Sequence, residues 1–379
     1  MSNWIYLDYN ASTPMAESVI QKMQESLSHQ AHPSSPHPHG QSTMALVSEA
    51  REQVAASLGC SADEIVFCSG STEAANHVIK GVCFDRLPDH RLHFISSVVD
   101  HAATTQPLEF LKKFGHQVTF LPTDTGGRID PCQVEKALQK NTVLVTLIHG
   151  QNEVGTVQPL QEIGSLLEHH PALFHVDASQ SFGKVPVDVE DLKADFLNIA
   201  GHKIYGPKGV GALFIREGRR LEPLLHGGGH ESGRRSGTPA PQLAAGLGEA
   251  CALVNRLGLL TDRPAEILWR ELAGRLKDRV VRNGDPHHRL PNVVHLTFQG
   301  VNGRELLNKA QVSASTGAAC HSATVSPVLQ ALGFTAESAR GSVRLSTGRG
   351  TDDDTALRAA SALSDAYELL RSNQEVQSR

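Results

Sequence analysis

Residues 173–215 read LFHVDASQSFGKVPVDVEDLKADFLNIAGHKIYGPKGVGALFI, and their pattern indicates the fold class. Three short runs in this segment, LFHVD, FLNIA and GALFI, are apolar almost throughout. Such runs are typical of strands that helices cover on both faces of a sheet. Asp177 stands at the end of the first run and Lys203 follows the second, so both residues are predicted to lie where strands end.

The same pattern extends toward the N-terminus. Four more apolar runs, EIVFCS, LHFISSVV, QVTFLP and TVLVTLIH, alternate with segments of helical periodicity. This alternation predicts an α/β fold with a mostly parallel seven-stranded sheet in a large domain over residues 15–245. The runs NVVHLTF and GSVRLST, with helical segments around them, predict a smaller α+β domain formed by residues 1–14 and 246–379.

The composition excludes several classes of protein. The formal net charge of −5 over 379 residues gives no sign of a nucleic-acid surface. The N-terminus MSNWIYLDYN lacks the features of a signal peptide, and no run approaches the ~18 apolar residues of a membrane span. None of the six cysteines forms a CxxC pair, so a zinc site is not expected. We therefore expect a cytoplasmic protein with neither nucleic acid nor membrane as a direct partner.

Polar residues that follow strands are the first candidates for a site, because ligands of open α/β sheets bind beyond the carboxyl ends of the strands. In FCSGSTEAANH, Ser71 and Thr72 open a helix and could seat a phosphate or simply cap the helix. His101 could stack on a flat ring or be an ordinary loop histidine. Asn152, in HGQNEVG, could hold a carboxylate or a phenolic oxygen, or serve only in a turn.

The segment quoted first adds three more candidates. Asp177 could pair with a protonated pyridine nitrogen or cap a helix, and Gln180 lies one helical step further on. Lys203 could bind an aldehyde covalently or be a solvated loop lysine. Pyridoxal phosphate needs such a lysine, a carboxylate for its ring nitrogen and a phosphate seat. Because Lys203, Asp177 and Ser71–Thr72 supply all three, the sequence predicts this cofactor.

The quoted segment, together with YLDYNASTP (6–14) and GGGHESGRRSGT (227–238), resembles the cysteine desulfurase family. This family belongs to the class-V aminotransferase superfamily of fold-type-I pyridoxal-phosphate enzymes. The resemblance spans nearly the whole chain and implies a homodimer with a shared active site. It also implies conversion of L-cysteine to L-alanine, transfer of the sulfur to a cysteine as a persulfide, and delivery to an acceptor protein or a small thiol, as in iron–sulfur cluster assembly.

The resemblance implies a role for each matched residue. Lys203 would bind the cofactor covalently and act in catalysis with His101, which would stack on the ring. Cys320, in a loop at about residues 315–326, would accept the sulfur. Arg344 would bind the substrate carboxylate, and Asn152 would lie near both that carboxylate and the phenolic oxygen of the cofactor. The remaining cofactor contacts would come from Ser71, Thr72, Asp177, Gln180, His202 and, from the other subunit, Thr238.

Some residues depart from the common pattern of the family. Ala200 replaces a phosphate-binding serine, and GAACHS (317–322) is similar to the loop of selenocysteine lyases. Ala102, however, stands where those lyases carry an acidic residue. We therefore predict a cysteine desulfurase, with a selenocysteine lyase as the alternative and a class-V aminotransferase without a cysteine nucleophile as a third. The role of His321, the sulfur acceptor and the pathway are left open by the sequence.

Overall fold

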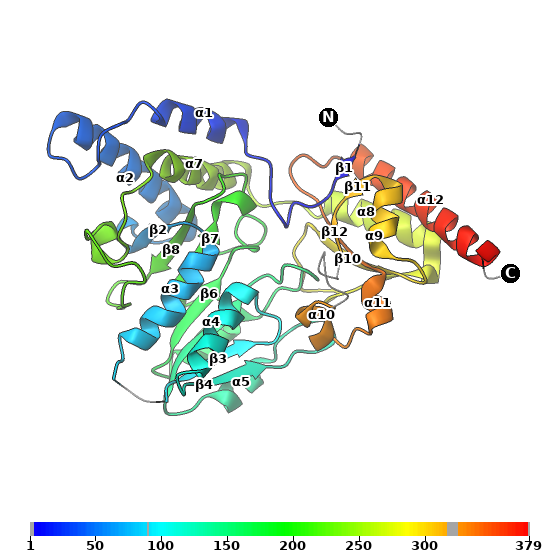
Figure 1. Cartoon of the computed structure of the whole chain (residues 1–379), viewed down its shortest axis with the longest axis horizontal. Helices are drawn as coiled ribbons and strands as arrows, with labels where there is room; N and C mark the ends of the chain where they lie inside the picture. Colours follow the sequence, from blue (N-terminus) through cyan, green and yellow to red (C-terminus); the bar gives the residue numbers. More distant parts are fainter. Residues whose placement is uncertain (1–3, 89–90, 317–324, 378–379) are drawn as a thin grey trace.

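A twisted sheet flanked by helices forms the larger part of the protein (Figure 1). The computed structural model describes residues 4–88, 91–316 and 325–377. Within them the large sheet has seven strands in the order β2-β8-β7-β6-β5-β3-β4. They are β2 (Ile65–Cys68), β3 (His93–Ser97), β4 (Gln117–Leu121), β5 (Thr142–Ile148), β6 (Leu173–Asp177), β7 (Phe196–Ala200) and β8 (Gly211–Ile215). β8 pairs antiparallel with β2 and β7, and the other described pairings of this sheet are parallel, so the predicted mostly parallel α/β fold is confirmed.

Both faces of this sheet are buried, which explains why its strands are continuously apolar. Ile65 and Phe67 of β2 belong to one hydrophobic cluster, whereas the alternate residues Val66 and Cys68 belong to another. The first cluster is completed by α1 (Glu17–Ser26), α2 (Pro38–Leu58), α5 (Pro131–Ala137), α6 (Leu160–Leu167) and α7 (Pro241–Leu257). The second is completed by α3 (Ser71–Phe84) and α4 (Ala102–Lys112).

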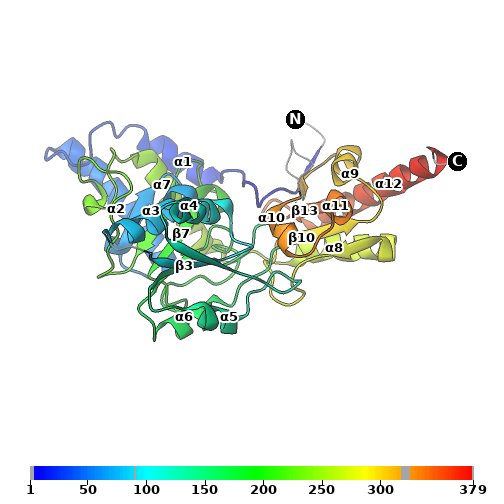
Figure 2. The ribbon, with the colours of Figure 1, turned by 60° about the horizontal axis from the view of Figure 1, so that its bottom comes forward.

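A second, smaller sheet lies beside the first (Figures 1 and 2). Its strands pair antiparallel in the order β12-β13-β10-β9 among the described residues. They are β9 (Val280–Arg282), β10 (Val293–Phe298), β12 (Ser315–Thr316) and β13 (Ser342–Ser346). Its own hydrophobic cluster includes residues of α8 (Arg263–Leu276), α9 (Gly303–Ala310) and α12 (Asp353–Gln377). No helix in the described part of the chain is both long and apolar enough to span a bilayer.

The N-terminal segment and two short helices are among the parts of the chain that join the smaller sheet to the larger one. The N-terminal segment starts at β1 (Ile5–Tyr6), which pairs with β11 (Val312–Ser313), and runs across to α1 (Figure 1). In addition, α10 (Pro327–Ala331) and α11 (Ala336–Arg340) pack through Leu329 and neighbours against Val99 and Val154, which follow β3 and β5. The smaller unit therefore borders the carboxyl ends of the large sheet's strands.

Candidate functional site

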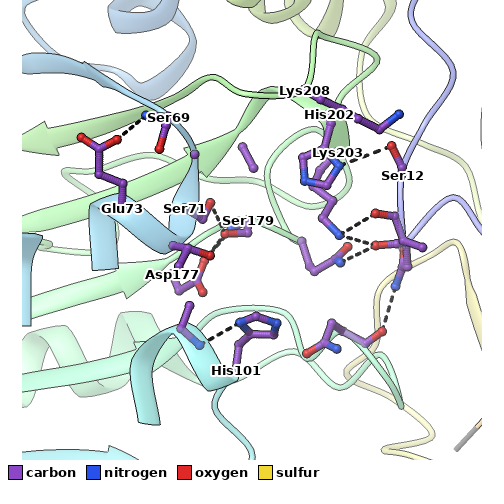
Figure 3. Close-up of a pocket in the computed structure, with 18 of the residues that line it drawn as sticks. Ser12, Ser69, Ser71, Glu73, His101, Asp177, Ser179, His202, Lys203 and Lys208 are labelled. Carbon is purple, nitrogen blue, oxygen red and sulfur yellow. Dashed lines mark hydrogen bonds between the residues drawn. The ribbon is translucent and has the colours of Figure 1, made fainter. Parts of the chain in front are cut away.

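A cavity of about 630 Å³ lies at the carboxyl ends of the parallel strands (Figure 3). Most of the predicted site residues line it: Ser71, Thr72, His101, Asn152, Asp177, Gln180, His202, Lys203 and Arg344. Thr238 does not line it; this exposed residue borders a neighbouring cavity of about 200 Å³, which shares Ser69 and Gly209 with the first. Cys320 and His321 lie outside the described residues.

The carboxylate of Asp177 is buried at the end of β6 and is held on one side only. Its Oδ1 accepts hydrogen bonds from the backbone N–H of Ser179 (3.0 Å), from the Ser179 hydroxyl and from Nδ2 of Asn198 (2.8 Å). All the hydrogen bonds of this carboxylate to described residues end on Oδ1. Oδ2 is therefore left for a ligand, and a protonated ring nitrogen would satisfy it.

Asn198 is itself fixed by a histidine inside the sheet. Nε2 of His175 donates to Oδ1 of Asn198 over 2.7 Å, because an amide oxygen can only accept. Nδ1 of His175 then accepts from the hydroxyl of Thr146 at 2.7 Å. This chain of hydrogen bonds orients Asp177, and the sequence reasoning missed it. The available signal was a polar residue in the middle of each apolar strand, since buried polar groups need partners.

Lys203 ends the short 3-10 helix Gly201–Lys203 directly after β7. Its Nζ donates to the backbone oxygens of Asn10 (2.5 Å) and Ala11 (3.1 Å). Burial and then the charge of Arg344 lower the pKa of Lys203 to about 8, although nearby carboxylates oppose this. A substantial fraction of the amine is therefore neutral, and hence nucleophilic, at mildly alkaline pH.

The part of the cavity at the N-terminus of α3 suits an anion. The N-terminus of α3 lies there, with Ser71 as its first residue, and the φ of 141° at Gly70 is readily adopted only by glycine. The hydroxyls of Ser71 and Ser179 are hydrogen-bonded to each other at 2.6 Å, which connects this end of the site to Asp177. Free N–H groups at a helix start bind phosphate well.

Basic side chains line the part of the cavity near Lys203. His202 and Lys208 both line the cavity, and Figure 3 shows them close together near Ser12. The hydroxyl of Ser12 lies 3.3 Å from Nδ1 of His202. Burial, together with the charges of Lys203 and Lys208, lowers the pKa of His202 to about 4. Lys208 and Ser12 were missed by the sequence reasoning, although both lie in segments that had been singled out.

His101 is the N-cap of α4. Its Nδ1 accepts a hydrogen bond from the backbone N–H of Ala103 at 3.1 Å. In the neutral ring the proton is therefore on Nε2, so that His101 offers a donor rather than an acceptor on that side.

Arg344 reaches the cavity from β13 of the smaller sheet, and its side chain is buried rather than a surface group. One terminal nitrogen donates to the backbone oxygen of Asn152 at 3.0 Å. The other donates to Oδ1 of Asp8 at 2.8 Å and to the hydroxyl of Ser315 at 2.7 Å. The first terminal nitrogen keeps a second N–H, and Nε has no partner among the described residues, so the guanidinium can still donate to a carboxylate.

Asn10, which the sequence reasoning also missed, joins the two parts of the site. It is fully buried, and its backbone N–H donates to Ser346 of the smaller sheet at 2.9 Å. Its backbone oxygen accepts from Gln180 at 2.8 Å as well as from Lys203. Asn10 lies in the N-terminal segment and not after a strand of the large sheet. A search for polar residues at strand ends therefore could not find it.

Taken together, these features fit pyridoxal phosphate. The phosphate could bind at the start of α3, the ring nitrogen at Oδ2 of Asp177, and the aldehyde at Nζ of Lys203. No group of three or more His, Cys, Asp or Glu residues within the described segments could hold a metal ion.

Comparisons with known proteins point in the same direction. The family model "Aminotransferase class-V" matches residues 5–355. The chain is 40% identical over 362 residues to the cysteine desulfurase IscS of Dictyoglomus turgidum, covering 92% of this chain and 90% of that protein. It is 39% identical over 366 residues to the human cysteine desulfurase, covering 92% and 79% of the two chains.

Solved structures share the fold over nearly the full length. A NifS-like protein superposes with a TM-score of 0.89 at 30% identity, covering 97% of this chain and 99% of its own. The structure of SspA in complex with cysteine superposes with a TM-score of 0.82 at 36% identity, covering 90% and 98%.

Proposed function

The chain belongs to the cysteine desulfurases of the class-V aminotransferase family, and on this premise we propose that it converts L-cysteine to L-alanine and takes the sulfur onto Cys320. One observation supports this above all. Lys203, Asp177 and the start of α3 line a single cavity, which the guanidinium-bearing side chain of Arg344 also lines. The family depends on pyridoxal phosphate, and the proposal assigns that cofactor to this cavity.

Several residues would hold the cofactor. The N-terminus of α3 with Ser71 and Thr72 would bind the phosphate, assisted by His202. Asp177 would hold the ring nitrogen protonated through Oδ2, since its Oδ1 is already occupied. The amide of Gln180 would meet the ring oxygen, and His101 would lie against the ring. Thr238 lies outside the cavity but is exposed next to it, which is consistent with its reaching the phosphate of a second copy in a homodimer.

The substrate's own groups would be handled by residues from both sheets. Arg344 would bind the carboxylate of L-cysteine, with Asn152 beside it. Nζ of Lys203, as a neutral amine, would remove the proton from Cα, and the lowered pKa of about 8 suits this role. Bound pyridoxal phosphate would draw the resulting electron pair into its ring. His101, whose Nε2 carries the ring proton, would donate that proton to the bound substrate.

Cys320 would complete the reaction as a thiolate. Its sulfur would attack the sulfur of the bound cysteine, so that an S–S bond forms and the Cβ–S bond of the substrate breaks. The electron pair of that bond would pass to Cβ, which is protonated as alanine leaves. Cys320 would then carry a persulfide for an acceptor protein or a small thiol.

Steady-state kinetics would test this proposal. The purified protein with pyridoxal phosphate should absorb near ~420 nm and release alanine from L-cysteine. The variant Cys320→Ser should keep the absorbance and lose alanine release. Full activity of that variant would indicate an aminotransferase without a cysteine nucleophile. A kcat/KM for L-selenocysteine that exceeds the value for L-cysteine by more than about 10³, or ~4 kcal/mol, would indicate a selenocysteine lyase instead.

A further inference from the structure

Lys184 is a buried lysine that the proposed reaction does not use. Its side chain is only 4% exposed, and it pairs with no carboxylate among the described residues. Burial, followed by the charges of Lys203 and Arg344, lowers its pKa well below the usual value. A lysine is costly to bury in this way, so its contacts with the neighbouring site residues are informative.

Those contacts are with two amide oxygens. Nζ of Lys184 donates to Oε1 of Gln180 over 2.8 Å and to Oδ1 of Asn10 over 3.1 Å. Gln180 precedes Lys184 by four residues in the turn that follows β6, so the two side chains lie on the same side of that turn. Lys184 thus lies directly behind a residue that lines the cavity.

These contacts determine which way the amide of Gln180 faces. A lysine amine bearing protons donates, so the amide atom opposite Lys184 is oxygen. The other amide atom lies 2.8 Å from the backbone oxygen of Asn10, which only accepts, so that atom is nitrogen. A flipped amide would place N–H against the donor and oxygen against the acceptor. In the observed orientation, one N–H of Nε2 binds Asn10 and the second is free of partners in the described segments.

We propose that Lys184 is a positioning residue that fixes the amide of Gln180 so that its N–H, and not its carbonyl oxygen, meets the ring oxygen of the cofactor. This inference rests on the proposed function, because it requires pyridoxal phosphate in the cavity. The ring oxygen is negatively charged when the bound cofactor absorbs in the visible range. A fixed N–H donor stabilises that charge, whereas a carbonyl oxygen in the same place would repel it.

The pH dependence of the holoenzyme's visible absorbance would report this directly. Replacing Lys184 with Met removes the donor while preserving most of the volume, so the amide is no longer held. A hydrogen-bond donor to the negatively charged ring oxygen lowers the pKa on which the visible band depends. Loss of this donor should therefore raise that pKa, measured as the pH midpoint of the change in visible absorbance, by about one unit. The milder variant Lys184→Gln, which cannot reach both oxygens, should shift the midpoint in the same direction. Phe182→Leu, a core change in the same turn, is the matched control and should leave it unchanged.

The decisive comparison uses Gln180→Ala. If Lys184 acts through Gln180, then Lys184→Met should shift the midpoint of the wild-type protein but not that of the Gln180→Ala protein. A shift of equal size in both backgrounds, or no shift in either Lys184 variant, would overturn the inference. A wild-type protein that gains no visible band with pyridoxal phosphate would instead contradict the proposed function, so the two failures are distinguishable.

Discussion

Oδ1 of Asp8 lies 2.8 Å from a terminal nitrogen of Arg344, and both side chains are largely shielded from solvent. The hydroxyl of Ser315 bridges them, at 2.9 Å from Asp8 and 2.7 Å from Arg344. Asp8 belongs to the N-terminal segment, whereas Ser315 and Arg344 belong to paired strands of the smaller sheet. The guanidinium that is proposed to bind the substrate carboxylate is thus oriented by residues far apart in the sequence.

Asp8→Asn tests whether this ion pair orients Arg344 for the substrate. The amide has nearly the shape of the carboxylate but lacks its charge, so Arg344 should be held less firmly. We expect KM for L-cysteine to rise about tenfold, equivalent to ~1.4 kcal/mol, with a much smaller change in kcat. Steady-state kinetics would measure both, and Arg263→Gln, which breaks an exposed ion pair with Asp353, is the control. A fall in KM would show that Asp8 competes with the substrate instead.

Asp177→Asn tests the assignment of the ring nitrogen. The neutral amide can keep the contacts of Oδ1 with Ser179 and Asn198, but it cannot hold a pyridine nitrogen protonated. We expect kcat to fall by about 10³, or ~4 kcal/mol, while the protein remains folded. Asn198→Ala leaves the carboxylate in place and removes only one of its supports, so its kcat should fall far less. Similar kcat values for the two variants would argue against a direct role for Asp177.

The strands of the large sheet could be predicted from the sequence because both of its faces are buried and the strands are therefore continuously apolar. Residues that follow them, such as Asp177 and Lys203, could be found by their position at strand ends. Asn10 could not, since only the tertiary structure brings it near Gln180 and Lys203. Lys184 lies four residues after Gln180, but only the structure shows that its side chain is buried against it.

Helix α2 begins inside a proline-rich segment. The segment HQAHPSSPHPHG (29–40) has the composition of irregular structure, yet α2 begins at Pro38. Proline is well tolerated at the first position of a helix, where its missing N–H would have no partner within the helix. Nδ1 of His37 then caps the helix by accepting from the N–H of Gly40 at 3.2 Å.

Gly70→Ala tests the proposed phosphate seat. A Cβ at this position would meet no atom within 4 Å, so the cost should come from the backbone, whose φ is 141°. We expect the free energy of unfolding to fall by roughly 1–3 kcal/mol and the affinity for pyridoxal phosphate to fall as the start of α3 shifts. Chemical denaturation and cofactor titration would measure the two effects. Unchanged cofactor affinity in a destabilised variant would place the phosphate elsewhere.

The rate at which the apoprotein takes up pyridoxal phosphate should report the ionisation of Lys203. Only the neutral amine attacks the aldehyde, and burial with the charge of Arg344 lowers the pKa of Lys203 from 10.5 to about 8. The rate should therefore rise about tenfold per pH unit below pH 8 and level off above it, because the amine is then already neutral. Stopped-flow measurements of the visible band would follow this, with Lys203→Ala as the control that forms no such band. A rate that still rises tenfold per unit up to pH 10 would mean that Lys203 ionises like an exposed lysine.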